Sequence, residues 1–170
     1  MRGDEHARGF TEGQRSGLRA HQIDRDRTLA AMHSLEAALA EAAPRREGPW
    51  FEAVIGALGD LEAVTAEELA NAERPDSLLS DLSRSQPRMR NRARALRLQY
   101  LKLREMISGL RQELGENGEE VDIGDVRQRI GWVLTALRHQ RARESDLIYE
   151  AYYDAFRAEL RRAEPEAGTS

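Results

Sequence analysis

Apolar residues recur at intervals of three and four along most of the chain, which is the spacing of one face of an α-helix. The longest such seam consists of Met89, Ala93, Leu96, Leu103, Ile107, Leu110 and Leu114. A shorter seam near the start consists of Leu29, Met32 and Leu39. Both patterns predict amphipathic helices that bury one stripe against neighbouring helices.

Proline and glycine residues divide these patterns into four long predicted helices. The predicted helices begin and end near residues 18 and 42, 49 and 74, 87 and 114, and 122 and 156. Pro44, Pro75 and the segment GENGEE (115–120) mark the breaks, and residues 76–85 form a short helical connector. Long helices joined by short links favour an all-α, antiparallel up-down-up-down four-helix bundle. An array of helical repeats is the alternative, although the segments share no period.

The two ends of the chain are polar and rich in charges or glycine. We therefore expect residues 1–17 to be a flexible N-terminal segment and residues 161–170 to be a disordered tail. The bundle itself is then expected to occupy residues 18–160.

Composition supports helices and narrows the classes of partner. Charged residues make up 33% of the chain and aromatic residues only 5%, which argues against a β-sandwich. The net charge of −4 gives no overall attraction for nucleic acid or anionic lipid. Two arginine-rich stretches, 88–97 and 138–144, are flanked by acids and lack interleaved aromatics, so nucleic-acid binding is not expected.

The chain contains no cysteine, which excludes disulfides and thiolate metal sites and fits a reducing compartment. The first residues lack the apolar core of a signal peptide, and no apolar run approaches the length of a membrane span. We therefore expect a soluble cytoplasmic protein that does not enter membranes.

Polar residues interrupt the apolar seams. Arg25 lies four residues before Leu29, and Tyr100 lies between Leu96 and Leu103. An unpaired charge in a core stripe costs on the order of 3–5 kcal/mol, so such groups need partners inside the protein. The seams therefore predict an enclosed polar spot.

Two carboxylates and a histidine are the candidate chemistry. Glu144 lies seven residues after Leu137 and so continues the stripe of the last helix, while His139 lies to one side of it. Glu73 closes the second helix. Each has an ordinary structural explanation as a surface residue, and His21 and His33 are further ligand candidates that are more simply read as surface residues.

The order of these elements resembles a hemerythrin-like domain over roughly residues 18–156. The resemblance is carried by DRTLAAMHSLEAALAE, TAEELANAERPDSLLSDL, RALRLQYLKLREMI and, most specifically, LRHQRARESDLIYEAY in the four helices. It implies a four-helix bundle with a non-haem di-iron centre held by histidines and carboxylates from all four helices.

Carried over by position, that iron site is degenerate. His139, Glu144 and Glu73 match family ligands. At four other positions the resemblance implies a lost histidine, and this chain has Arg25, Leu69, Tyr100 and Arg104. Arginine and leucine cannot bind a metal ion, so three matching groups are too few to enclose two irons.

We hypothesise that a guanidinium replaces the metal: Arg25 pairs with Glu144 or Glu73, and Tyr100 donates a hydrogen bond. If so, Arg25→Ala should destabilise the fold by several kcal/mol.

We therefore expect a non-catalytic regulatory or interaction bundle that has no cofactor. It is expected to act through an unknown protein partner or through self-association. The alternative is an iron-binding protein that uses a residual site of His139, Glu144 and Glu73 in oxygen or iron sensing or storage. An enzyme is the weakest class, because the chain shows no nucleophile with a nearby base.

Overall fold

The computed structural model describes residues 8–41, 43, 47–117 and 120–164. Within these ranges the chain forms six α-helices and no strand. The helices are α1 (Glu12–Ala40), α2 (Glu47–Ala72), α3 (Leu78–Ser85), α4 (Pro87–Asn117), α5 (Ile123–Ala151) and α6 (Tyr153–Ala163). The predicted all-α class is confirmed.

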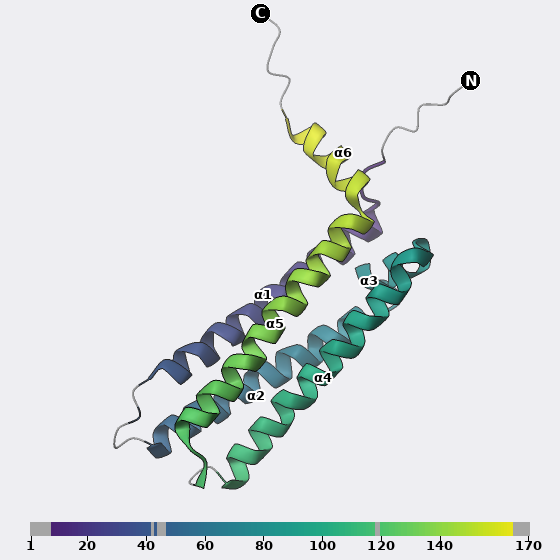
Figure 1. Ribbon diagram of the computed structural model, residues 1–170. Coiled ribbons are helices and arrows are strands. Elements are labelled where there is room, and N and C mark those ends of the chain that lie inside the picture. Colours follow the sequence, from purple (N-terminus) through teal and green to yellow (C-terminus); the bar gives the residue numbers. More distant parts are fainter. Residues whose placement is uncertain (1–7, 42, 44–46, 118–119, 165–170) are drawn as a thin grey trace, which may run out of the picture.

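Four long helices lie side by side, and each runs opposite to the long helix before it (Figure 1). Helix α2 packs against both α1 and α4, and α4 packs against α5. The short α3 joins α2 to α4 at the end where α1 begins, and α6 leaves this same end at an angle to α5 (Figure 1).

Helix α1 begins six residues before its predicted start. Oγ1 of Thr11 accepts a hydrogen bond from the Gln14 amide (3.1 Å), and Oε1 of Gln14 accepts one from the Thr11 amide (3.0 Å). This capping box satisfies two backbone donors, so residues 12–17 are helical although the sequence predicted a flexible segment. Gly17 is buried against α3, where a Cβ would lie 3.3 Å from the Leu78 nitrogen. The expectation for residues 1–7 lies outside the described residues.

The last predicted helix is two helices, because the chain bends at Tyr152 between α5 and α6. The Tyr152 hydroxyl lies 2.6 Å from Oδ2 of Asp81 and 3.1 Å from the Leu78 carbonyl oxygen, which ties this bend to α3. Residues 161–163 of the predicted tail belong to α6, and residues 165–170 lie outside the described part.

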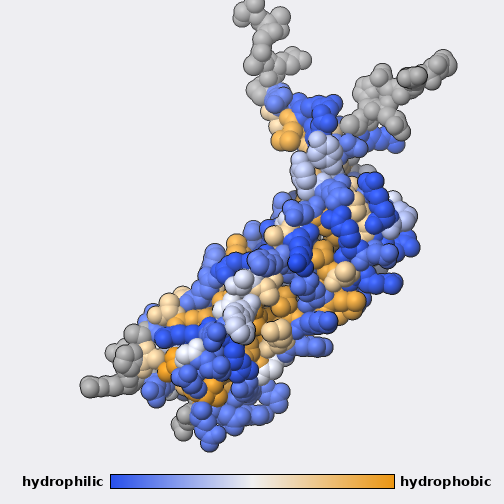
Figure 2. Space-filling view, viewed as in Figure 1, coloured by the Kyte–Doolittle hydropathy of each residue, from blue (hydrophilic) through white to orange (hydrophobic). Residues whose placement is uncertain are grey.

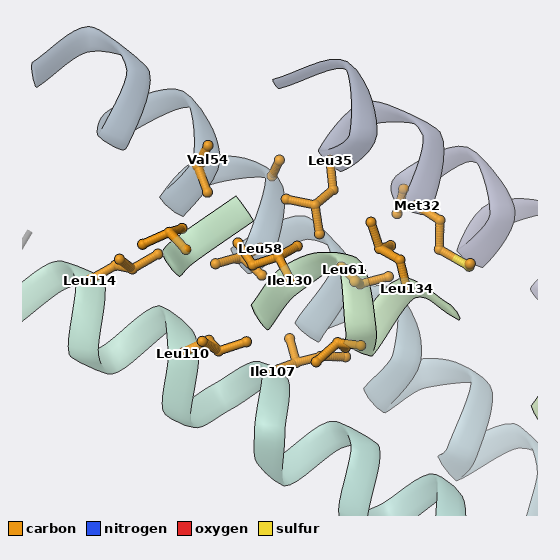
Figure 3. Close-up of a cluster of buried hydrophobic side chains, with 14 of the residues drawn as sticks. Met32, Leu35, Val54, Leu58, Leu61, Ile107, Leu110, Leu114, Ile130 and Leu134 are labelled. Carbon is orange, nitrogen blue, oxygen red and sulfur yellow. The ribbon is translucent and has the colours of Figure 1, made fainter. Parts of the chain in front are cut away.

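Two hydrophobic clusters make up the core of the part of the chain that the structure describes. The larger one joins the four long helices; Figure 3 shows part of it, with Leu35 of α1, Leu58 of α2, Ile107 of α4 and Ile130 of α5 converging. The smaller one lies at the α3 end and consists of Phe10, Leu78, Leu82, Met89, Leu147, Ile148 and Tyr152.

On the face shown in Figure 2, hydrophilic residues predominate and hydrophobic ones form small, interrupted areas. Among the described residues, none of the helices has a stretch sufficiently long and apolar to cross a membrane.

The buried stripe of α1 is rotated from the predicted one. Leu29 is 39% exposed, whereas Thr28, Met32 and Leu35 are completely buried. Arg25 was placed in the core from its spacing to Leu29, and it therefore lies at the edge of the buried stripe rather than in it.

Candidate functional site

A layer of polar side chains separates the two hydrophobic clusters. We call it the polar layer; it consists of His21, Asp24 and Thr28 of α1, Glu68 of α2, Tyr100 of α4, and Gln140, Arg141 and Glu144 of α5. On each long helix these residues extend the helical spacing of the core stripe, so all four helices direct polar groups to one level. An enclosed polar spot, as the seams predicted, is therefore present.

Glu68 is the centre of the polar layer. Its Oε2 atom accepts hydrogen bonds from the Tyr100 hydroxyl (3.1 Å) and from the hydroxyl of Thr28. Burial, and then the neighbouring Glu68 carboxylate, raise the pKa of Tyr100, so its hydroxyl remains a donor at physiological pH. Tyr100 is buried, and its hydroxyl donates to the Glu68 carboxylate, which fits its position in the seam.

The guanidinium in the polar layer belongs to Arg141. Its NH1 lies 3.6 Å from Oε2 of Glu68, and its NH2 donates to the backbone carbonyl of Arg25. Arg141 is 8% exposed and Glu68 is also 8% exposed, so this is a buried ion pair. The guanidinium joins α5 to both α1 and α2.

Glu144 lies beside His21 in the same layer, with Nε2 of His21 3.2 Å from Oε1 of Glu144. Burial, reinforced by the positive charges of Arg25 and Arg141, lowers the pKa of His21 to about 4. Burial and the Glu68 carboxylate raise the pKa of Glu144 to about 7, against the opposing effect of the two arginines. The imidazole is therefore neutral, and this contact is not an ion pair.

Arg25 takes a different partner from the one expected. Its guanidinium donates to Oγ of Ser145 rather than pairing directly with Glu144 or Glu73. The neighbouring Asp24 binds Asn71 instead: Nδ2 of Asn71 lies 3.1 Å from each Oδ atom of Asp24 and donates to them. The predicted pairing of Arg25 with Glu144 or Glu73 is therefore wrong, and the buried guanidinium of the polar layer is that of Arg141, which was not predicted from the sequence.

Two of the expected site residues lie at the surface. Glu73, in the turn after α2, is exposed and pairs with Arg97 of α4, with 2.7 Å between Nε and Oε1. His139 is exposed as well, one position before the buried Gln140. Neither joins Glu144, because Glu73 lies beyond the end of α2 and the buried stripe of α5 passes through Gln140 rather than His139.

The other positions of the predicted site are spread along the helices. Leu69 is partly buried and packs against the larger hydrophobic cluster. Arg104 lies one turn after Tyr100, and its Nε is buried without a hydrogen-bond partner among the described residues. Of the predicted polar cluster, Tyr100 and Glu144 belong to the layer, while Arg25 lies at its edge.

Glu68, Gln140 and Arg141 were missed, although the signal was present in the sequence. Glu68 lies seven residues after the buried Leu61, and Arg141 lies four after the buried Leu137. This is the same spacing that identified Glu144.

A cleft of about 1130 Å³ opens beside the polar layer towards α3. Glu68, Tyr100, Gln140 and Glu144 line its deep end. Nε2 of Gln140 donates to the Leu96 carbonyl at 2.7 Å, whereas Oε1 is buried and accepts no hydrogen bond within the described part of the chain. A buried acceptor without a donor is costly, so this atom indicates room for a ligand or an ordered water.

The donor set of the polar layer does not fit a di-iron centre. It offers one imidazole, and the Glu68 carboxylate is already shared by two hydroxyl donors and a guanidinium. In the described ranges, no three histidine, aspartate or glutamate side chains converge in a way that could hold a metal ion. The resemblance therefore does not extend to the ligands themselves.

Replacing Glu144 by glutamine tests its burial. Because the folded pKa of Glu144 exceeds the ordinary value of 4.5, the unfolded chain loses this proton first, and Glu144 costs stability progressively as pH rises from 4.5 to about 7. Relative to wild type, Glu144→Gln should thus gain up to about 1.4 kcal/mol per pH unit over that window. Urea denaturation of wild type and variant measures this difference in stability. His21, whose pKa is lowered, has the opposite pH dependence, but it is present in both proteins and therefore cancels in the difference.

The matched control for this experiment is Glu73→Gln at the exposed carboxylate, for which no comparable slope is expected. A wild-type-to-Glu144→Gln difference that stays constant between pH 4.5 and 7 would contradict the burial of an ionisable carboxyl in the polar layer.

Comparison with known proteins gives no relative from which a function could be taken: no family model matches the chain, and no curated protein or solved structure matches it.

Proposed function

We propose that this protein is a non-catalytic regulatory or interaction protein of the cytoplasm, an antiparallel up-down-up-down four-helix bundle of hemerythrin-like type. In this proposal Arg141 supplies the positive charge that metal ions supply in such domains. Self-association or an unidentified protein partner is the expected mode of action, and no cofactor is required.

The position of Arg141 carries the proposal. Its guanidinium lies against the Glu68 carboxylate and against the α1 backbone, where it neutralises a buried negative charge. Tyr100 and Thr28 use their hydroxyl groups on the same carboxylate. Arg141, Tyr100 and Thr28 are thus all engaged with one carboxylate, which suits a structural or sensing role better than acid–base chemistry on a substrate.

Exposed aromatic residues support a role in interaction. Trp132 of α5 is 66% exposed, and Tyr149 and Tyr153 are both exposed and contact each other near the bend between α5 and α6, with ring centroids 5.7 Å apart. Aromatic side chains are enriched where proteins bind one another.

Metal analysis of protein purified without chelators tests the proposal. We expect well under one metal ion per chain, also after incubation with excess Fe(II) and desalting. Two irons per chain with oxo-to-iron absorption would overturn it. Size-exclusion chromatography with light scattering measures self-association on the same sample.

An iron-binding protein used in oxygen or iron sensing or storage is the alternative. The His21–Glu144 contact favours it, because a neutral imidazole can bind a metal ion. The expected ligands His139 and Glu73 lie at the surface, however, so they do not join this contact. Metal bound at one ion per chain and lost in a His21→Gln variant would favour this alternative.

A further inference from the structure

The cleft beside the polar layer presents hydrogen-bond acceptors at its deep end. Glu68 and Glu144 line it with carboxyl groups, and Asp24 adds a third carboxylate from α1. Gln140 adds the buried Oε1 atom that accepts no hydrogen bond from the described residues. Gln140 is only 1% exposed. The missing hydrogen-bond donor to its Oε1 atom must therefore come from a molecule inside the cleft, whether water or a ligand.

The charges at this level are not balanced when Glu144 is ionised. Three carboxylates, those of Asp24, Glu68 and Glu144, face the guanidinium groups of Arg25 and Arg141. The side chain that Asp24 binds is the neutral amide of Asn71 rather than a cation. One further positive charge with N–H donors would neutralise the group.

The cleft is also lined by apolar side chains. Leu69 of α2, Leu79 of α3 and Leu96 of α4 line it, each partly buried in a hydrophobic cluster. A short alkyl chain attached to the cation would cover these leucine side chains and gain from their removal from water.

We propose that this cleft binds a primary alkylammonium group, with the ammonium donating to Gln140 Oε1 and to the neighbouring carboxylates. The inference rests on the proposed function in one respect, namely that no metal ion occupies the polar layer.

Calorimetric titration with n-butylammonium chloride at about pH 8 tests the proposal, since Glu144 is then mostly ionised and the amine is protonated. We expect saturable binding. Butan-1-ol, which lacks the charge, and tetraethylammonium, which lacks N–H donors, should both bind at least tenfold more weakly. Binding of butan-1-ol or of tetraethylammonium as tight as that of n-butylammonium would overturn the proposal.

The same chemical change at two depths of the cleft provides matched variants. Glu144→Gln removes a carboxylate at the deep end and should weaken butylammonium binding at least tenfold. Glu73→Gln removes a carboxylate at the rim, where Glu73 pairs with Arg97, and should change binding less than twofold. Equal effects of the two variants would overturn the proposal.

A titration with the methylamide of Nα-acetyl-lysine distinguishes a free amine from the side chain of a protein partner. Binding of this compound at least tenfold more tightly than butylammonium supports the lysine source, and weaker binding supports a free amine. Absence of binding by both overturns the inference.

Metal analysis of the titrated sample keeps this inference separate from the proposed function. Metal bound to the protein would contradict the proposed function. Metal-free protein that binds neither ammonium compound would contradict the ammonium site alone.

Discussion

Arg141→Ala should lower the free energy of unfolding by about 3 kcal/mol, at the lower end of the range for breaking a buried ion pair. The substitution leaves the Glu68 carboxylate buried with only the Thr28 and Tyr100 hydroxyl donors. It also removes the donor to the Arg25 carbonyl, which links α5 to α1. Urea denaturation at neutral pH measures the loss.

Arg143→Ala is the matched control, two residues further along α5. Arg143 is exposed and donates to Oε1 of Gln99, so its removal should change stability by less than about 0.5 kcal/mol. A loss below about 1 kcal/mol for Arg141→Ala would show that this guanidinium does not neutralise a buried charge.

A double variant separates the cost of a broken pair from the value of an intact one. Glu68→Leu combined with Arg141→Met replaces both charges by apolar groups, which in buried ion pairs is often neutral or stabilising. The double variant should therefore be more stable than Arg141→Ala alone. If it is less stable, the two residues do not form the ion pair that the geometry indicates.

The spacing of apolar residues predicted the long helices and the existence of a polar spot, but it misplaced the residues on α1. Leu29 was taken as a core position, and Arg25 was assigned to the core from it. The structure buries Thr28 and exposes Leu29, because small polar groups with partners can occupy the stripe that leucine would otherwise fill. The buried stripe of α1 thus differs from the predicted one by a single position, and this shift gives Arg25 the partner Ser145 in place of the expected carboxylates.

The site residues on α2 and α5 were misplaced for a related reason. Glu73 and His139 were named as candidates from their places in the predicted helices and then matched to family ligands, whereas the helical spacing from Leu61 and Leu137 leads to Glu68 and Arg141. Spacing also placed Glu144 correctly in the interior. Which carboxylate meets which guanidinium depends on the relative heights of four helices, and no pattern within a single helix contains that information.

The boundaries of the helices depend on local chemistry that the apolar pattern does not report. The capping box of Thr11 and Gln14 starts α1 before any apolar repeat begins. At the other end, the buried stripe continues through Tyr152, so the pattern predicted one helix where the chain bends into two.

Leu58→Ala should lower the free energy of unfolding by about 2.7–5 kcal/mol, the range for removing a completely buried leucine from a packed core. Leu58 lies in the larger hydrophobic cluster (Figure 3) and is not one of the residues that line the cleft. Leu98→Ala is the control, because Leu98 is 53% exposed on α4 and its loss should cost less than about 0.5 kcal/mol. Since Leu58 does not line the cleft, the folded Leu58→Ala variant should still bind butylammonium within twofold of wild type. A Leu58→Ala variant as stable as Leu98→Ala would contradict the packing of the four long helices around this residue.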